Sequence, residues 1–250
     1  MIYSNPMYTN VETTSIYANE NTATYQGITL KTLLLLGIAG ISGILGGLFI
    51  SYTQNLVYYF VALLVALIAG FITVIIGRSN PKKAMVCSII YSISEGLVIG
   101  MITLVADYFY QGIALIAVAS TAVIFAVCLA LFASGAMRNV SKLKSMFILI
   151  LCSIVAVSIV LILLTVFNID NTAAVIKSYY KMVIFLEFLY ILYGCVMLFF
   201  NFNEATLYVQ EGAIKSFEWV AAFGLVLSIL YIYLEILRLL LYIMQYARND

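Results

Sequence analysis

The sequence predicts an all-α, polytopic membrane protein with seven transmembrane helices. Of its 250 residues, 65% are hydrophobic and only 9% are charged, whereas soluble domains have roughly 45–50% apolar and about 25% charged residues. The apolar residues gather in seven runs, each close to the ~20 residues that cross a bilayer as a helix. Pro6 and Pro81 are the only two prolines, so helix-breaking residues hardly interrupt these runs. The lipid bilayer is therefore the predicted surroundings of most of the chain.

A polar tail comes first, at residues 1–28, and no Lys or Arg precedes Lys31. A secretory signal peptide has a positively charged start and an early apolar core, so the tail is interpreted as a disordered or surface-lying arm. The transmembrane domain is predicted over residues 29–245. Its seven spans are predicted at about 29–51, 56–77, 83–106, 111–134, 145–168, 179–202 and 219–243.

The first span contains a series of glycines. Gly43 and Gly47 have the spacing of a GxxxG motif, in which small residues let two helices approach closely in lipid. We expect this face to pack against another helix, and a role in lining a permeation path is the alternative.

Basic residues indicate the orientation of the spans. They gather in two loops, "GRSNPKK" at 77–83 and "MRNVSKLK" at 137–144, whereas the loops around 52–55 and 107–111 contain no Lys or Arg. Cytoplasmic loops of membrane proteins are enriched in Lys and Arg. The N-terminus is therefore predicted in the cytoplasm and, after seven spans, the C-terminus outside.

Composition argues against several classes of function. The net charge of +1 predicts no nucleic-acid partner. The chain has no histidine, and no HExxH, GxSxG or nucleophile–base motif is present, so neither an enzyme nor a bound cofactor is expected. The four cysteines each lie in an apolar run without a CxxC motif, and they are interpreted as small buried hydrophobic residues rather than disulfides or metal ligands. They are Cys87, Cys128, Cys152 and Cys195.

Four ionisable residues lie well inside predicted spans: Glu95, Glu187, Glu235 and Arg238. A charge at the middle of a span costs roughly 2.5–3.5 kcal/mol on insertion scales, and such residues are functional candidates by default. Helical spacing from Glu235 reaches further small or polar residues on the same face of the last span. These are Gly224, Ser228, Tyr231, Arg238 and Tyr242. A stripe of this kind is expected to face protein or water rather than lipid.

Two interpretations of these charges are open. In the first, Glu235 and Arg238 pair as i, i+3 neighbours and Glu95 bonds to hydroxyl groups, so that the charges hold helices together. In the second, Glu95, Glu187 and Glu235 line a proton- or cation-sensitive path, because one arginine inside the spans cannot balance three carboxylates. Calcium prefers oxygen ligands, and Glu235 and Glu95 are the candidate cation ligands.

Three segments resemble one family of membrane proteins. They are "TYQGITLKTLLLL" at 24–36, "YSISEGLVIG" at 91–100 and "EWVAAFGLVLSILYIYLEILRLL" at 218–240. In this order they are similar to the bacterial YccA-like branch of the Bax inhibitor-1 family, over about residues 22–245. The resemblance implies seven helices with the last at the centre of the other six, in the bacterial plasma (inner) membrane. It also implies a pH-sensitive leak channel for calcium or other cations, with Ca²⁺ as the possible permeant ion.

The resemblance implies roles for particular residues as well. In the better-studied branch, an acidic residue near the end of the sixth span pairs with one in the seventh as a proton-controlled latch, and the seventh-span position falls on Glu235. The sixth-span position falls in "FFNFNEATL", where this chain has Asn201 and Asn203, with Glu204 one residue further. Asn cannot ionise, and a shift of one residue turns a helical side chain by about 100°.

We therefore expect Glu235 to be the proton sensor or ion ligand, with Arg238 as its counter-charge or as a plug. Glu95 and Glu187 would line the path. Asn201 and Asn203 would offer neutral oxygens, or would only cap the helix and form hydrogen bonds at the membrane interface.

The same resemblance implies an alternative of another class. The chain would then be an interaction protein that modulates a membrane-bound quality-control protease and has no transport activity. The polar tail at 1–28 is the feature that discriminates between the two, because a partner outside the bilayer would engage it, whereas a cation path would not need it.

Overall fold

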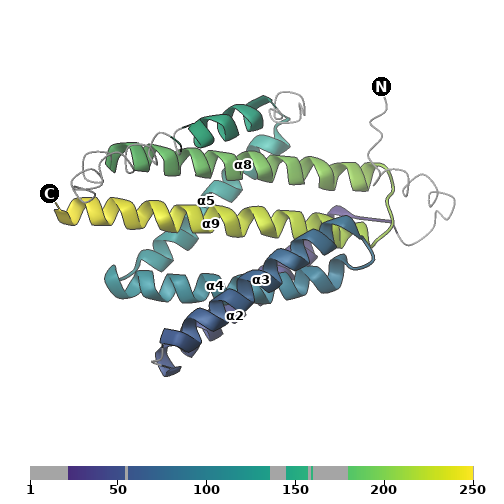
Figure 1. The fold of residues 1–250 in the computed structure, drawn as a ribbon. Coiled ribbons are helices and arrows are strands. Elements are labelled where there is room, and N and C mark those ends of the chain that lie inside the picture. The colour runs from purple at the N-terminus through teal and green to yellow at the C-terminus, as the bar shows by residue number, and fades with distance from the viewer. Residues whose placement is uncertain (1–21, 54–55, 136–144, 157–158, 160–179, 250) are drawn as a thin grey trace. The chain divides into compact units, whose positions relative to one another are not determined.

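The computed structural model describes residues 22–53, 56–135, 145–156, 159 and 180–249. Figure 1 shows that these residues are almost entirely helical, and an isolated antiparallel bridge joins Thr22 to Ile214. Six of the described helices are long and apolar enough to cross a membrane, and Ser145–Ala156 forms a shorter apolar helix. The long helices are α2 (Tyr25–Thr53), α3 (Leu56–Ser79), α4 (Ala84–Phe109), α5 (Ile113–Ala133), α8 (Tyr180–Gln210) and α9 (Phe217–Asn249). The predicted fold class, an all-α polytopic membrane protein, is confirmed.

Several helices are longer than the apolar runs. The first begins at Tyr25 rather than at 29, and α8 continues to Gln210 through residues that the sequence suggested were a loop after 202. Hydropathy marks the part of a helix that suits lipid, whereas helical hydrogen bonding continues into polar sequence. The end of α8 is instead followed by Gly212, whose φ of 67° is the left-handed conformation typical of a glycine after a helix. Of the predicted fifth span, 145–168, residues 157–158 and 160–168 lie outside the described residues.

The chain divides into two compact units, and α4, α8 and α9 contribute to both. The first unit contains residues 1–102 and 201–227, and the second contains residues 103–200 and 228–250.

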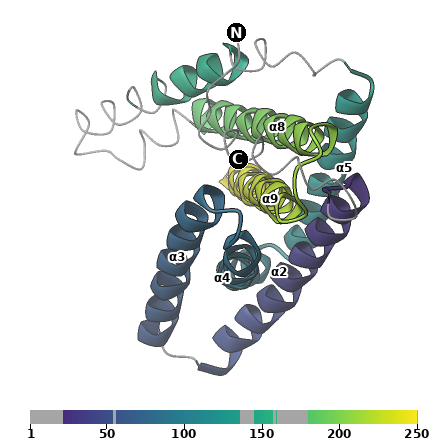
Figure 2. The same cartoon turned by 90° about the vertical axis from the view of Figure 1, so that its right-hand side faces the viewer.

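In the first unit, α2 and α3 lie on opposite sides of α4 (Figure 2). The contact between α2 and α4 depends on glycines: a Cβ atom added at Gly100 would overlap the backbone of Gly43, and one added at Gly46 would lie 2.7 Å from the carbonyl oxygen of Leu97. This is the close helix packing that small residues permit in membranes. Gly43 therefore has the packing role that its spacing predicts.

The first part of α9 lies among the other helices of this unit. The Phe223 ring is 5.2 Å from the Tyr91 ring of α4, between ring centroids, and a Cβ atom at Gly77 of α3 would lie 2.7 Å from Phe223. In the apolar stretch of the span Phe217–Ala247, 83% of the residues are buried, whereas at most 39% are buried in the corresponding stretches of the other described spans. Among the spans that the structure describes, the last helix is therefore the most enclosed, in line with the central place that the resemblance implies.

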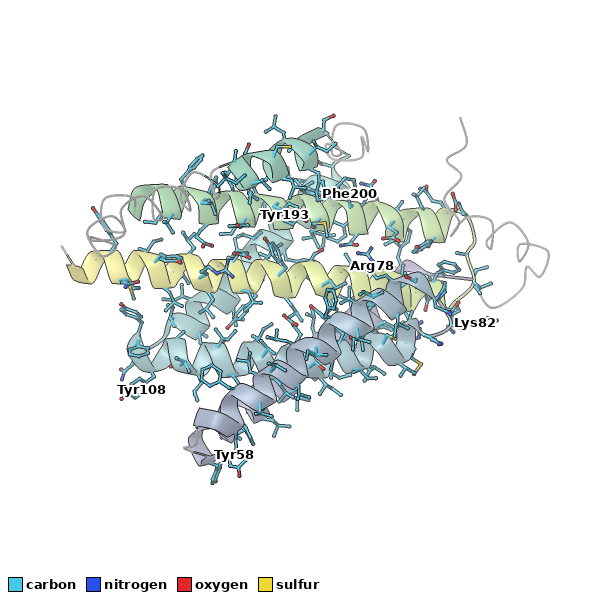
Figure 3. All side chains as sticks on the ribbon, viewed as in Figure 1. Tyr58, Arg78, Lys82, Tyr108, Tyr193 and Phe200 are labelled. Carbon is cyan, nitrogen blue, oxygen red and sulfur yellow. The ribbon has the colours of Figure 1, made fainter. Side chains whose placement is uncertain are left out.

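In the second unit, the helix Ser145–Ala156 packs along α8. The ring of Phe147 lies 5.0 Å from that of Tyr193 and 5.7 Å from that of Phe200, between centroids. Figure 3 labels Tyr193 and Phe200 on α8. Ile150 and Ile154 are buried with Val196 in the same cluster. Apolar and aromatic side chains therefore pack the short helix against α8.

Candidate functional site

Three of the predicted site residues meet in the second unit, between α8 and α9. Arg238 Nη1 lies 2.9 Å from Glu235 Oε2 on the same helix and 3.8 Å from Glu187 Oε2 on α8. We call Glu187, Glu235 and Arg238 the carboxylate cluster. The helices approach closely here because α8 has a glycine at 194: a Cβ atom there would lie 2.7 Å from Ile232 Cγ1.

The two carboxylates of the cluster are buried, whereas its guanidinium group is not. Glu187 and Glu235 are each 4% exposed, while the Arg238 side chain is 49% exposed. In the described part of the chain, Glu187 Oε2 accepts no hydrogen bond. Two carboxylates therefore share one guanidinium group, and a buried charge without full compensation is costly. A proton or a bound cation would balance the remaining negative charge.

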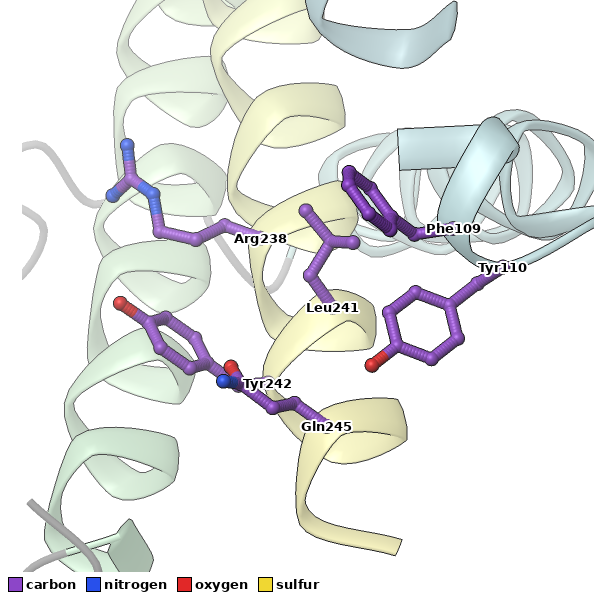
Figure 4. A pocket seen from close by; sticks show the side chains of 6 residues that line it. All are labelled: Phe109, Tyr110, Arg238, Leu241, Tyr242 and Gln245. Carbon is purple, nitrogen blue, oxygen red and sulfur yellow. The ribbon is translucent and has the colours of Figure 1, made fainter. Parts of the chain in front are cut away.

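Arg238 also lines an open pocket of about 400 Å³ next to the cluster. In Figure 4 its guanidinium group points toward α8, away from Phe109 and Tyr110 on the other side of α9. The lining residues are Phe109, Tyr110, Arg238, Leu241, Tyr242 and Gln245. Of the carboxylate cluster, Arg238 is the member that lines this pocket.

Asn201 and Glu204 lie in the first unit, where they bind Arg78 of α3. Arg78 Nη2 donates hydrogen bonds to Asn201 Oδ1 at 3.4 Å and to Glu204 Oε2 at 3.1 Å. Asn201 Nδ2 donates to the carbonyl oxygen of Gly224 at 2.9 Å. We call these residues the Arg78 network; Arg78 is labelled in Figure 3. The recorded partners of Glu204 are thus Arg78 and Tyr208, whereas Glu235 pairs with Arg238.

Replacing Asn201 by leucine (Asn201→Leu) is expected to lower the free energy of unfolding by about 1–3 kcal/mol, because it removes an acceptor from Arg78 and a donor to Gly224 inside a buried site. The measurement is thermal unfolding of the purified protein in detergent. Gln210→Leu, at the exposed end of α8, is the control. Equal unfolding temperatures for Asn201→Leu and the wild type would contradict this role of the network.

Two further predicted residues are Glu95 and Asn203. Glu95 is half-buried on α4 in the first unit, and a Cβ atom at Gly70 of α3 would lie 3.7 Å from Glu95 Oε2. Its carboxylate makes no ion pair with any residue that the structure describes. Asn203 is half-buried on α8. The structure therefore unites Glu187 with Glu235 and Arg238. It also unites Asn201 with Glu204 through Arg78.

A buried ion pair at the start of α2 was not foreseen from the sequence. Glu218, in the first turn of α9, is 1% exposed and forms an ion pair with Lys31. It also accepts hydrogen bonds from Thr24 N at 2.9 Å and from Thr24 Oγ1 at 3.0 Å. We call Thr24, Lys31 and Glu218 the Glu218 clasp. Both charges lie near the ends of spans, where charged residues are common. The signal that could have indicated them is that both fall in segments that resemble the family, at 24–36 and 218–240.

Thr24 has a second role, because it caps α2. Its hydroxyl oxygen accepts a hydrogen bond from Gly27 N at 3.0 Å, as an N-cap residue does. The carboxylate of Glu218 lies at the same helix start, where negative charge is stabilised by the helix dipole. A Cβ atom at Gly27 would overlap this carboxylate, so the glycine leaves the space that the clasp occupies.

Comparison with known proteins is consistent with this architecture. The model of the family described as Bax inhibitor 1 like matches residues 5–245. No match was found among curated proteins or among solved structures. The YccA-like branch stays a prediction. Since the match covers nearly the whole chain, and the described helices are those of a multi-pass protein in contact with the lipid bilayer, this integral membrane protein belongs to the Bax inhibitor 1 like family.

Proposed function

We propose that the protein lets cations, Ca²⁺ among them, pass slowly across the bacterial plasma membrane in a pH-dependent manner. The observation that carries this proposal is the carboxylate cluster, in which two buried acids share one partly exposed guanidinium group. Ionisable residues inside a membrane protein typically mark ion or proton paths.

The cluster supports the proposal through its charge balance. When both carboxyl groups are ionised, Arg238 offsets only one of them, so the site attracts either a proton or a cation. Calcium takes about six to eight oxygen ligands; Glu187 and Glu235 offer carboxylate oxygens, and water from the neighbouring pocket would complete the set. In this proposal Glu235 senses protons or binds the ion, and Arg238 is the counter-charge that a cation displaces.

The orientation belongs to the same proposal. Arg78 lies in the last turn of α3, and Lys82 and Lys83 follow in the turn before α4, so the positive-inside rule would place this end in the cytoplasm. The second basic loop, 137–144, lies outside the described residues. The N-terminus would then be cytoplasmic and the C-terminus outside. We propose neither a catalytic reaction nor a resident cofactor.

The test is Ca²⁺ entry into liposomes that contain the purified protein and a trapped calcium indicator, measured across a range of pH. Wild-type flux is expected to vary with pH, and Glu235→Gln is expected to weaken that variation because glutamine cannot change its charge. Glu211→Gln, at an exposed position in the turn after α8, is the matched control and should behave as the wild type. Replacing Glu95, Glu187 and Glu235 together by glutamine is the stronger variant.

Two results would contradict the proposal: wild-type flux no greater than that of protein-free liposomes, or the same pH profile for Glu235→Gln and wild type. The alternative, an interaction protein that modulates a membrane-bound protease, depends on the tail at 1–28. Residues 1–21 lie outside the described residues, so that alternative stays a prediction.

A further inference from the structure

One carboxylate oxygen of the carboxylate cluster has no hydrogen-bond donor. Arg238 Nη1 donates a hydrogen bond to Glu235 Oε2 at 2.9 Å, whereas it lies 3.8 Å from Glu187 Oε2. This oxygen of Glu187 is buried and, among the residues that the structure describes, accepts no hydrogen bond. With both carboxyl groups ionised, the cluster has one net negative charge. Glu187 Oε2 is therefore the atom at which a cation can bind.

We propose that the cluster accepts singly charged cations in preference to Ca²⁺, and that Arg238 is the residue that determines this preference. The inference rests on the proposed function, in which the cluster meets the passing cation, and it specifies the class of cation. A buried net charge is costly. One Na⁺ or K⁺ makes the cluster neutral, whereas one Ca²⁺ leaves it with a net positive charge as long as the guanidinium group stays in place.

The position of the guanidinium group supports the same preference. Arg238 Nη1 lies within 4 Å of both acids, at 2.9 Å from Glu235 Oε2 and 3.8 Å from Glu187 Oε2, where a cation that bridges the two carboxylates would have to bind. Ca²⁺ takes about six to eight oxygen ligands. The part of the chain that the structure describes contains no group of three or more His, Cys, Asp or Glu residues that could hold a metal ion. A singly charged cation that contacts Glu187 and water fits this site better than Ca²⁺.

The same charge count predicts the effect of removing Arg238. The cluster would then have two net negative charges, which one Ca²⁺ balances and one Na⁺ does not. Charges a few Å apart interact strongly away from bulk water, so the loss of the guanidinium group is expected to favour the divalent cation by about tenfold or more. In the proposed function, Arg238 would thus be the residue that keeps the passage of Ca²⁺ slow.

The first test compares wild-type protein and Arg238→Gln in liposomes that contain the purified full-length chain. Trapped indicators measure Na⁺ entry and Ca²⁺ entry separately. We expect the wild type to pass Na⁺ faster than Ca²⁺, and Arg238→Gln to raise the ratio of Ca²⁺ entry to Na⁺ entry by about tenfold or more. Arg238→Lys keeps the charge and should keep the wild-type preference. Lys215→Gln, at an exposed position in the turn before α9, is the control and should keep the wild-type ratio.

The second test measures binding and needs no flux. A cation that binds the folded protein raises its unfolding temperature. In detergent at matched ionic strength, Na⁺ should stabilise the wild type at a lower concentration than Ca²⁺ does, and this order should reverse in Arg238→Gln. The unfolding curves also show whether the variant is folded. If Arg238→Gln does not fold, the order of the two cations in the wild type decides.

The combined results separate this inference from the proposed function. Entry of both cations with the same ratio in Arg238→Gln and wild type would overturn the inference and leave the proposed function standing. Entry of neither cation, together with the expected reversal in detergent, would contradict the proposed function alone. Entry of neither cation without that reversal would contradict both. A wild type that favours Ca²⁺ over Na⁺ in both tests would also overturn the inference.

Discussion

Replacing Glu218 by glutamine (Glu218→Gln) is expected to lower the free energy of unfolding by about 3–5 kcal/mol, the usual cost of removing one partner of a buried ion pair. Glu218 is 1% exposed. The substitution leaves Lys31 without its counter-charge, and it weakens the acceptor for Thr24 at the start of α2. We expect α2 to separate from α9 at a lower temperature than in the wild type.

The single tryptophan makes this measurement direct. Trp219 follows Glu218 in the sequence, and the ammonium nitrogen of Lys31 lies 5.0 Å from the centroid of its ring. Thermal unfolding in detergent, followed by the fluorescence of Trp219, therefore reports on the Glu218 clasp itself. The control is Glu211→Gln, an exposed carboxylate in the neighbouring turn.

A second variant separates charge from packing. Replacing Lys31 by methionine together with Glu218 by leucine removes both charges, and apolar replacement of a whole buried pair is often neutral. The double variant should therefore be more stable than Glu218→Gln. If Glu218→Gln unfolds at the same temperature as the wild type, the clasp does not stabilise the protein.

Replacing Gly100 by alanine (Gly100→Ala) is expected to lower the free energy of unfolding by about 1–3 kcal/mol, the usual cost of overpacking a tight core. The added methyl group would overlap the backbone of Gly43. A backbone cannot rotate away as a side chain can, so α2 and α4 would have to move apart. Thermal unfolding in detergent measures the effect.

Gly40→Ala is the matched control, because a Cβ atom at Gly40 of α2 meets nothing within 4 Å. Alanine is favoured over glycine in a helix by roughly 0.5–1 kcal/mol, so this variant should be as stable as the wild type or slightly more stable. If both variants shifted the unfolding temperature in the same direction and to the same extent, close contact between α2 and α4 would not explain the glycine at 100.

The sequence was informative wherever a property repeats along one helix. Apolar runs predicted spans that overlap the six long helices the structure describes. The i, i+3 spacing of Glu235 and Arg238 offered their ion pair as one interpretation, and the structure contains it. The extension of α8 to Gln210 was missed because hydropathy reports suitability for lipid rather than helicity.

Contacts between helices were harder to foresee, because they depend on how each helix is rotated about its axis. Glu187 lies 3.8 Å from Arg238 across two helices that pack closely at Gly194. Arg78 served in the sequence as a marker of orientation, whereas in the structure it binds Asn201 and Glu204. The local sequence around Glu187 or Arg78 does not indicate which residue of another helix it contacts.

The short backbone pairing just before α2 limits how many times the chain can cross the bilayer between α2 and α9. Ala23 N donates a hydrogen bond to the carbonyl oxygen of Ala213 at 2.7 Å, so the beginning of α2 and the turn between α8 and α9 share one side of the membrane. The number of crossings between them must then be even. The described helices α2, α3, α4, α5 and α8 supply five candidate spans between these two points, and the span that the sequence predicts at 145–168 would be the sixth.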